Sequence, residues 1–170
     1  PGVWIWEDSH SKDQMDGYVF ALAAMYDAAK GDPDIDQGLV AQMEQDATDI
    51  AIMLMEKRTV TMITGGEAEY DLIIMDADGR PTFHHDLNPY SLEKAYFPEG
   101  EKLFNTFNLI MTLGILKGLH HISGMPELEQ FLYEDLMVAR NFLEMVPKSE
   151  VDGAVDYIYA KKLTNHSNVN

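Results

Sequence analysis

The stretch SKDQMDGYVFAL, residues 11–22, does most to decide how this chain folds. Ser11 and Gln14 match the capping box, in which a hydroxyl residue at the start of a helix is followed three positions later by Glu or Gln. From Tyr18 onward, apolar side chains recur at helical spacing. The stretch therefore predicts a helix over residues 12–30 that is polar where it begins and apolar along its length.

Composition limits the classes of function that this chain can serve. It has 170 residues, 46% of them hydrophobic, which fits one globular domain. The formal net charge of −17 repels nucleic acids and anionic membranes, so neither is expected as a partner. Cysteine is absent, which excludes disulfides, thiol catalysis and thiolate metal sites. No apolar run approaches the roughly 20 residues that span a bilayer.

Periodicity along the chain predicts a mainly α-helical fold of antiparallel helical hairpins with a small two-stranded β-hairpin inserted. We expect a single helical domain over residues 1–164, an insertion over about 59–100 and a polar tail over 165–170. The expected helices cover residues 12–30, 33–58, 101–122, 127–145 and 150–163. The expected strands cover 59–63 and 70–75, and a turn at 76–81 leads into a long loop over 82–100.

Three motifs carry a resemblance to a known group. They are SKDQ (11–14) with GYVFAL (17–22), DADGRPT (76–82), and LFNTFNL (103–109) leading to LKGLHHISG (116–124). Over residues 9–146 the chain resembles the helical-toroid, (α/α)6-type proteins of environmental bacteria, whose architecture is similar to that of six-hairpin glycosidases and polysaccharide lyases. Lys12 stands where the group has Arg. Five helices are fewer than the twelve of a toroid, so the chain resembles part of one.

The resemblance implies a carbohydrate-active or carbohydrate-binding protein, a polysaccharide hydrolase or lyase if it is an enzyme. It also implies export from a bacterial cell, and the first residue, Pro1, is consistent with a processed or trimmed chain. Two alternatives remain open. One is a non-catalytic assembly subunit whose apolar helix faces are covered by a partner chain, and the other is a calcium-stabilised structural module.

The candidate catalytic residues are Asp13 at the start of the first helix and His84, His85 and Asp86 in the long loop. A carboxylate and an imidazole are the side chains that most often exchange protons with a substrate. We expect the two segments to converge on one pocket. The alternatives are helix capping for Asp13 and hydrogen bonding within the loop for the other three residues.

Substrate-binding roles are predicted for Trp4, Trp6, Gln14, Tyr18 and Asn105. The two tryptophans offer flat apolar faces for sugar rings, although they equally suit a lead-in strand pinned to the core. No cofactor and no transition-metal site is expected. Asp76 and Asp78 share the first marks of a calcium loop, but a tight turn needs the same residues and is the preferred interpretation.

Overall fold

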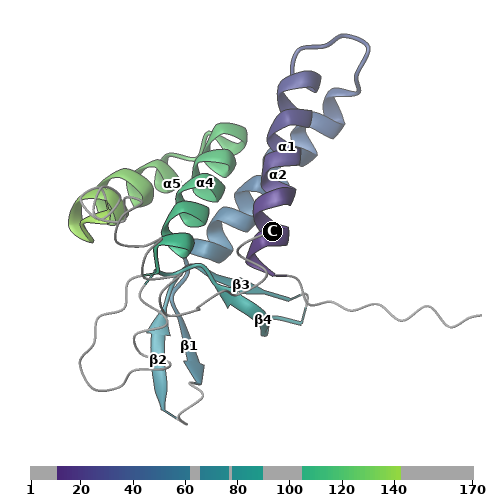
Figure 1. Ribbon diagram of the computed structural model, residues 1–170. Coiled ribbons are helices and arrows are strands. Elements are labelled where there is room, and N and C mark those ends of the chain that lie inside the picture. The colour runs from purple at the N-terminus through teal and green to yellow at the C-terminus, as the bar shows by residue number, and fades with distance from the viewer. Residues whose placement is uncertain (1–10, 62–65, 77, 90–104, 143–170) are drawn as a thin grey trace, which may run out of the picture.

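The computed structural model describes residues 11–61, 66–76, 78–89 and 105–142, and within them the fold is mainly helical, as predicted (Figure 1). Two short antiparallel hairpins accompany the helices. In chain order the elements are α1 (Lys12–Ala29), α2 (Gln37–Met55), β1 (Arg58–Thr61), β2 (Glu67–Tyr70), β3 (Ile73–Met75), β4 (Pro81–Asp86), α4 (Thr106–Ser123), α5 (Pro126–Gln130) and the π-helix η1 (Phe131–Ala139).

Three helices form the body of the molecule. α1 and α2 lie side by side as an antiparallel hairpin, and α4 packs against both of them (Figure 1). Both hairpins of strands lie at the end of this layer where α1 and α4 begin. The core between the helices is apolar and is filled mainly by Met15, Val19, Leu22, Tyr26, Met43, Ala47, Ala51, Leu54, Ile115, Leu116 and Leu119.

The ends of α1 and α2 follow from their capping residues. α1 begins at Lys12 with the predicted capping box, and Gln14 Oε1 accepts a hydrogen bond from Ser11 N at 2.8 Å. The predicted start of the second helix at residue 33 is wrong. Residues 32–35 form a turn, and Asp36 caps α2 by accepting a hydrogen bond from Gly38 N at 2.9 Å. The Asp32 side chain accepts a hydrogen bond from Asp34 N within this turn, at 2.9 Å.

The strands differ from the single predicted hairpin. β1 pairs with β2, and β3 pairs with β4, so the predicted strand over 70–75 is in fact split. The split falls at Leu72, whose φ of 60° breaks the extended backbone. The predicted loop over 82–100 is also wrong at its start, because residues 81–86 form β4. Proline and aspartate are depleted in strands, and they stand at the two ends of β4, so its composition gave only a weak strand signal.

α4 is the inner helix of the layer, as its apolar sequence predicts. It begins at Thr106 rather than at residue 101, because Asn105 Oδ1 caps it by accepting from Asn108 N at 3.2 Å. It ends at Gly124, which adopts the left-handed conformation that glycine tolerates. α4 approaches α1 closely at Gly118, where a β-carbon would lie 2.7 Å from Val19 Cγ1. His121 Nε2 adds a 2.6 Å contact to Asp27 Oδ1 of α1.

The predicted helix over 127–145 begins at Pro126, close to the expected position, but it changes character. After five α-helical residues it continues as η1 and ends at Arg140. The predicted helix over 150–163, the tail and the lead-in over 1–10 lie outside the described residues. No helix within the described ranges combines the length and the apolar character that crossing a membrane requires.

Candidate functional site

The first turn of α1 carries the polar residues that the sequence singles out. Asp13 and Gln14 are both exposed there. Asp13 accepts a hydrogen bond from Ser11 Oγ, and Gln14 accepts one from Ser11 N. The helix dipole favours negative charge at this position, by typically 0.3–1 kcal/mol. Ser11 thus hydrogen-bonds both side chains at the start of the helix, and both remain exposed to solvent.

One turn further along, α1 carries two titratable groups that burial perturbs. Burial raises the pKa of Asp16, whose Oδ1 lies 3.7 Å from where a β-carbon on Gly114 of α4 would be. Burial and the charge of Asp46 raise the pKa of Tyr18, which is 47% exposed. A carboxyl that holds its proton to higher pH than usual is suited to donate it. Asp16 is therefore a candidate proton donor, and it is not among the site residues predicted from the sequence.

Beneath this surface, a chain of buried polar side chains joins α1 to α4. Lys12 Nζ donates to Asn108 Oδ1 at 2.8 Å, and Asn108 Nδ2 donates to the Asn88 carbonyl at 3.2 Å. Lys12 is 8% exposed and Asn108 is fully buried. Thr112 extends the contact by donating to the Leu87 carbonyl at 2.6 Å. These bonds fix the beginning of α1 against the beginning of α4.

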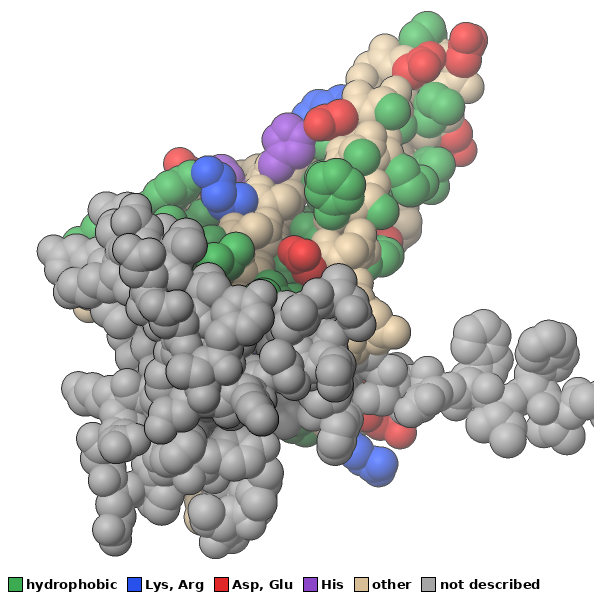
Figure 2. Space-filling model, in the orientation of Figure 1, with side chains coloured by type: hydrophobic (Ala, Val, Ile, Leu, Met, Phe, Trp, Pro, Cys, Tyr) green, Lys and Arg blue, Asp and Glu red, His purple; other side chains and the backbone are tan. Residues whose placement is uncertain are grey.

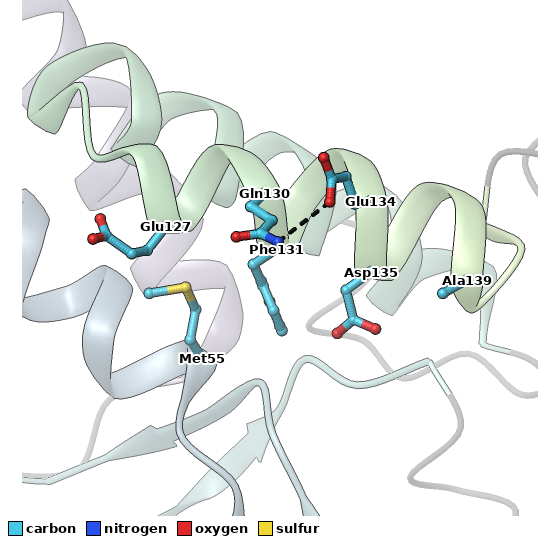
Figure 3. A pocket seen from close by; sticks show the side chains of 7 residues that line it. All are labelled: Met55, Glu127, Gln130, Phe131, Glu134, Asp135 and Ala139. Carbon is cyan, nitrogen blue, oxygen red and sulfur yellow. Dashed lines mark hydrogen bonds between the residues drawn. The ribbon is translucent and has the colours of Figure 1, made fainter.

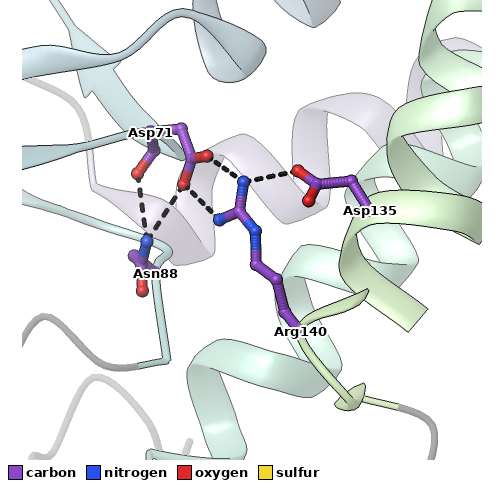
Figure 4. Close-up of polar contacts among 4 residues, drawn as sticks. All are labelled: Asp71, Asn88, Asp135 and Arg140. Atoms are coloured by element: carbon purple, nitrogen blue, oxygen red, sulfur yellow. Dashed lines mark hydrogen bonds and ion pairs between the residues drawn. The ribbon is translucent and has the colours of Figure 1, made fainter. Parts of the chain in front are cut away.

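The same chain continues to an ion-pair cluster at the far side of the junction (Figure 4). Asn88 Nδ2 donates to Asp71 Oδ1 at 3.0 Å. The guanidinium of Arg140 donates to both oxygens of Asp71, the Nη1 bond measuring 2.9 Å, and to Asp135 Oδ2 at 2.6 Å. Asp71 is only 2% exposed, so these partners replace the water that its carboxylate gives up on burial.

The predicted convergence of the α1 start with residues 84–86 involves the elements α1 and β4. α1 lies beside β4, the strand that carries His84, His85 and Asp86 (Figure 1). The side chains of these three residues lie outside the described part of the structure, as do Trp4 and Trp6. Their convergence with Asp13 on one pocket stays a prediction.

Asn105 and the Asp76 turn have structural partners. The Asn105 side chain caps α4, as described above, and it is half-buried. Asp76 Oδ1 accepts from Arg80 N at 2.7 Å, and Gly79 adopts a φ of 76°, so Asp76 closes the turn between β3 and β4. Asp78 is exposed. Among the described residues, no group of three or more His, Asp or Glu side chains is arranged to hold a metal ion. The calcium alternative stays a prediction.

The buried chain from Lys12 to Arg140 was missed in the sequence. Its members are separated by up to 128 positions. Lys12 and Asn108 fall in two of the motifs quoted above, but no motif links them to Asp71, Asn88 or Arg140. Asn88 and Asp71 lie at turns, where such residues are common for local reasons. The only usable signal was Lys12 itself, a cation at the first position of a helix, where the dipole disfavours positive charge.

An open groove lies between the end of α2 and the α5–η1 segment (Figure 3). It shares Asp135 with the ion-pair cluster. Its volume is about 470 Å³. Its walls combine apolar side chains with carboxylates: Met55, Glu127, Gln130, Phe131, Glu134, Asp135 and Ala139. None of the residues predicted as a site lines it.

Comparison with known proteins does not assign a function to this chain. No family model matches the chain, and no curated protein or solved structure is significantly similar to it.

Proposed function

We propose that this chain is a carbohydrate-binding helical protein, part of an (α/α)6-type toroid, and that sugar binds at the end of the helical layer where α1 and α4 begin. The observation that carries the proposal is the joining of these two helix starts by the bond from Lys12 to Asn108. That bond brings the exposed Asp13 and Gln14 to a fixed polar end beside β4. Carboxylate and amide groups of this kind hydrogen-bond sugar hydroxyls.

The net charge narrows the class of polysaccharide. With a formal charge of −17, the chain repels polyanions, so the proposed ligand is a neutral polysaccharide rather than a polyuronate. Cleavage by hydrolysis belongs to the same proposal. Glycosidases use two carboxyl groups, one of which keeps its proton to higher pH. Burial raises the pKa of Asp16, so Asp16 is the proposed proton donor and Asp13 the proposed second carboxyl group. His84, His85 and Asp86 are the proposed further proton-transfer groups.

Affinity electrophoresis in gels containing xylan or laminarin tests binding. The expected result is retardation of the wild-type chain, a reduced retardation of Asp13→Asn and Asp16→Asn, and no retardation in gels containing alginate. Asp34→Asn is the matched control, because Asp34 is exposed on the connection between α1 and α2 at the opposite end of the layer. Equal migration of the wild-type chain in all gels, or equal loss in the control, contradicts the proposal.

A second candidate, the assembly subunit, is favoured by apolar side chains that the described surface leaves uncovered. Phe20 of α1 is 78% exposed and Met25 is 55% exposed. On the face shown in Figure 2, hydrophobic side chains lie among acidic ones along the helical part. Light scattering after gel filtration separates the two candidates: an assembly subunit forms a stable oligomer that Phe20→Ser weakens, whereas a 19.2 kDa monomer speaks against it.

A further inference from the structure

The helix that follows α4 changes its hydrogen-bond register after one turn. Residues 131–139 form the π-helix η1, and at its end Arg140 N donates to the Asp135 carbonyl, five residues back, at 2.8 Å. π-helices are rare and usually limited to a single turn. A π-helix of nine residues therefore needs a contact that compensates for leaving the α-helical register.

Arg140 supplies such a contact. Its guanidinium binds both carboxylate oxygens of Asp71 and one of Asp135 (Figure 4). Its Cζ lies 5.4 Å from the centre of the Phe131 ring. Burial alone would lower the pKa of Arg140, but the hydrogen bonds to the two carboxylates raise it above its ordinary value. Arg140 thus contacts the start of η1 at Phe131, its middle at Asp135, and Asp71 outside the helix.

The fixed point is Asp71. It lies between β2 and β3, is 2% exposed, and is bonded to Asn88 in the buried chain described above. Leu72 N also donates to the Leu54 carbonyl at 2.7 Å, which ties this turn to the end of α2. In a π-helix each amide bonds the carbonyl five residues back, so one turn contains more residues than the 3.6 of an α-helical turn. Over nine residues the two registers therefore point Arg140 in different directions, and in the wide register Arg140 bonds Asp71.

We propose that the α5–η1 segment is a two-register helix whose wide register is held by the ion pair between Arg140 and Asp71. When this pair is broken, residues 131–139 return to α-helical hydrogen bonding. Phe131, Asp135 and Ala139 belong to η1 and also line the groove, so the register sets the shape of the groove (Figure 3). The ion pair between Arg140 and Asp71 thereby couples the turn between β2 and β3 to the shape of the groove along η1.

Couplings across hydrogen bonds, measured by NMR on the deuterated full chain, report directly which carbonyl each amide uses. The test variant is the double substitution Asp71→Asn with Arg140→Gln, because removing one partner alone strands a buried charge. The control is Arg58→Gln, which removes an arginine paired only with the neighbouring Glu56 among the described contacts. The wild type and the control are expected to show coupling of the residue 140 amide to the Asp135 carbonyl, and the double variant to the Leu136 carbonyl.

Two outcomes overturn the proposal. Coupling to Asp135 that persists in the folded double variant shows that the register does not depend on the pair. Coupling to Leu136 in the wild type shows that the wide register is not the native one. If the double variant does not fold, Arg140→Lys replaces it: lysine keeps the charge but cannot bridge both carboxylates, so coupling to Leu136 is expected to appear beside that to Asp135. Coupling to Asp135 alone in that variant rejects the proposal.

Discussion

Single buried polar residues carry the junction between the helices. Asn108 is fully buried, accepts from Lys12 and donates to the Asn88 carbonyl. A buried amide whose hydrogen bonds are all made adds little to the free energy of unfolding. A buried donor or acceptor that loses its hydrogen bond lowers that free energy by about 1–3 kcal/mol. The loss of stability on removing Asn108 therefore depends on the buried groups that were bonded to it. A substitution at this position measures how much the junction contributes to stability.

Replacing Asn108 with leucine is expected to lower the free energy of unfolding by about 2 kcal/mol, because the Asn88 carbonyl and Lys12 each lose a hydrogen bond inside the protein. Urea denaturation followed by circular dichroism measures the change. Gln42→Leu is the control: Gln42 bonds Asp46 on the exposed face of α2, and its loss is expected to change stability by less than about 0.5 kcal/mol. Equal stability of the two variants would refute the role of Asn108.

Asp16 is expected to make stability depend on pH. Burial raises its pKa above 3.8, the ordinary value that the unfolded chain keeps, so the folded state binds this proton more tightly. Burying the charged carboxylate lowers the stability of the folded state. This loss is absent below pH 3.8 and complete above the pKa of the folded state. Asp16→Asn is thus expected to stabilise the protein at pH 7, by less than about 1 kcal/mol because solvent screens the exposed carboxyl.

Urea midpoints at pH 3, 5 and 7 check this expectation. The difference between Asp16→Asn and the wild type should be near zero at pH 3 and grow as the pH rises. Asp13→Asn, one turn earlier and hydrogen-bonded to Ser11, is the comparison and should show no such gain. A gain for Asp16→Asn that is largest at pH 3 would have the wrong sign.

At the scale of elements, the contact between α1 and α4 depends on the size of residue 118. A β-carbon at Gly118 would lie 2.7 Å from Val19 Cγ1, which is closer than such atoms approach, whereas one at Gly17 would meet nothing within 4 Å. Gly118→Ala is expected to destabilise the protein by about 1–3 kcal/mol through overpacking. Gly17→Ala is expected to stabilise it by about 0.5–1 kcal/mol through helix propensity.

Thermal or urea unfolding of the two variants provides the comparison, since both make the same chemical change within a helix. Adding Val19→Ala to Gly118→Ala should recover part of the loss, because the crowded methyl group is removed. If both alanine variants are equally stabilising, the close approach of the two helices is refuted.

The elements also show what could be read from the sequence. The start of α1 follows the capping-box rule and was predicted, and the helix ends within one residue of the expected position. The split at Leu72 and the pairing of β4 depend on contacts with other segments, and no local pattern marks them. The same holds for the site: Asp13 and Gln14 were found through a motif, whereas the chain from Lys12 to Arg140 exists only in the folded molecule.

At the scale of the whole molecule, the negative charge is expected to limit stability. A formal charge of −17 on 170 residues produces self-repulsion in the compact state, which salt screens over a Debye length of about 10 Å at 0.1 M. Raising sodium chloride from 10 to 200 mM should therefore raise the urea midpoint. Potassium chloride as a second salt separates screening from specific binding of sodium, and a midpoint that falls with both salts would contradict the expectation.

The central claim is that the end of the layer where α1 and α4 begin is the place where neutral polysaccharide binds. Titration of the 15N-labelled chain with xylohexaose and laminarihexaose, followed by amide chemical shifts, tests it most directly. The account predicts that shifts change with one of these ligands and cluster at residues 11–18 and 105–112, with residues 30–36 at the opposite end unchanged. No change with either ligand, or changes that cluster at residues 30–36 or around the groove at residues 127–139, would contradict it.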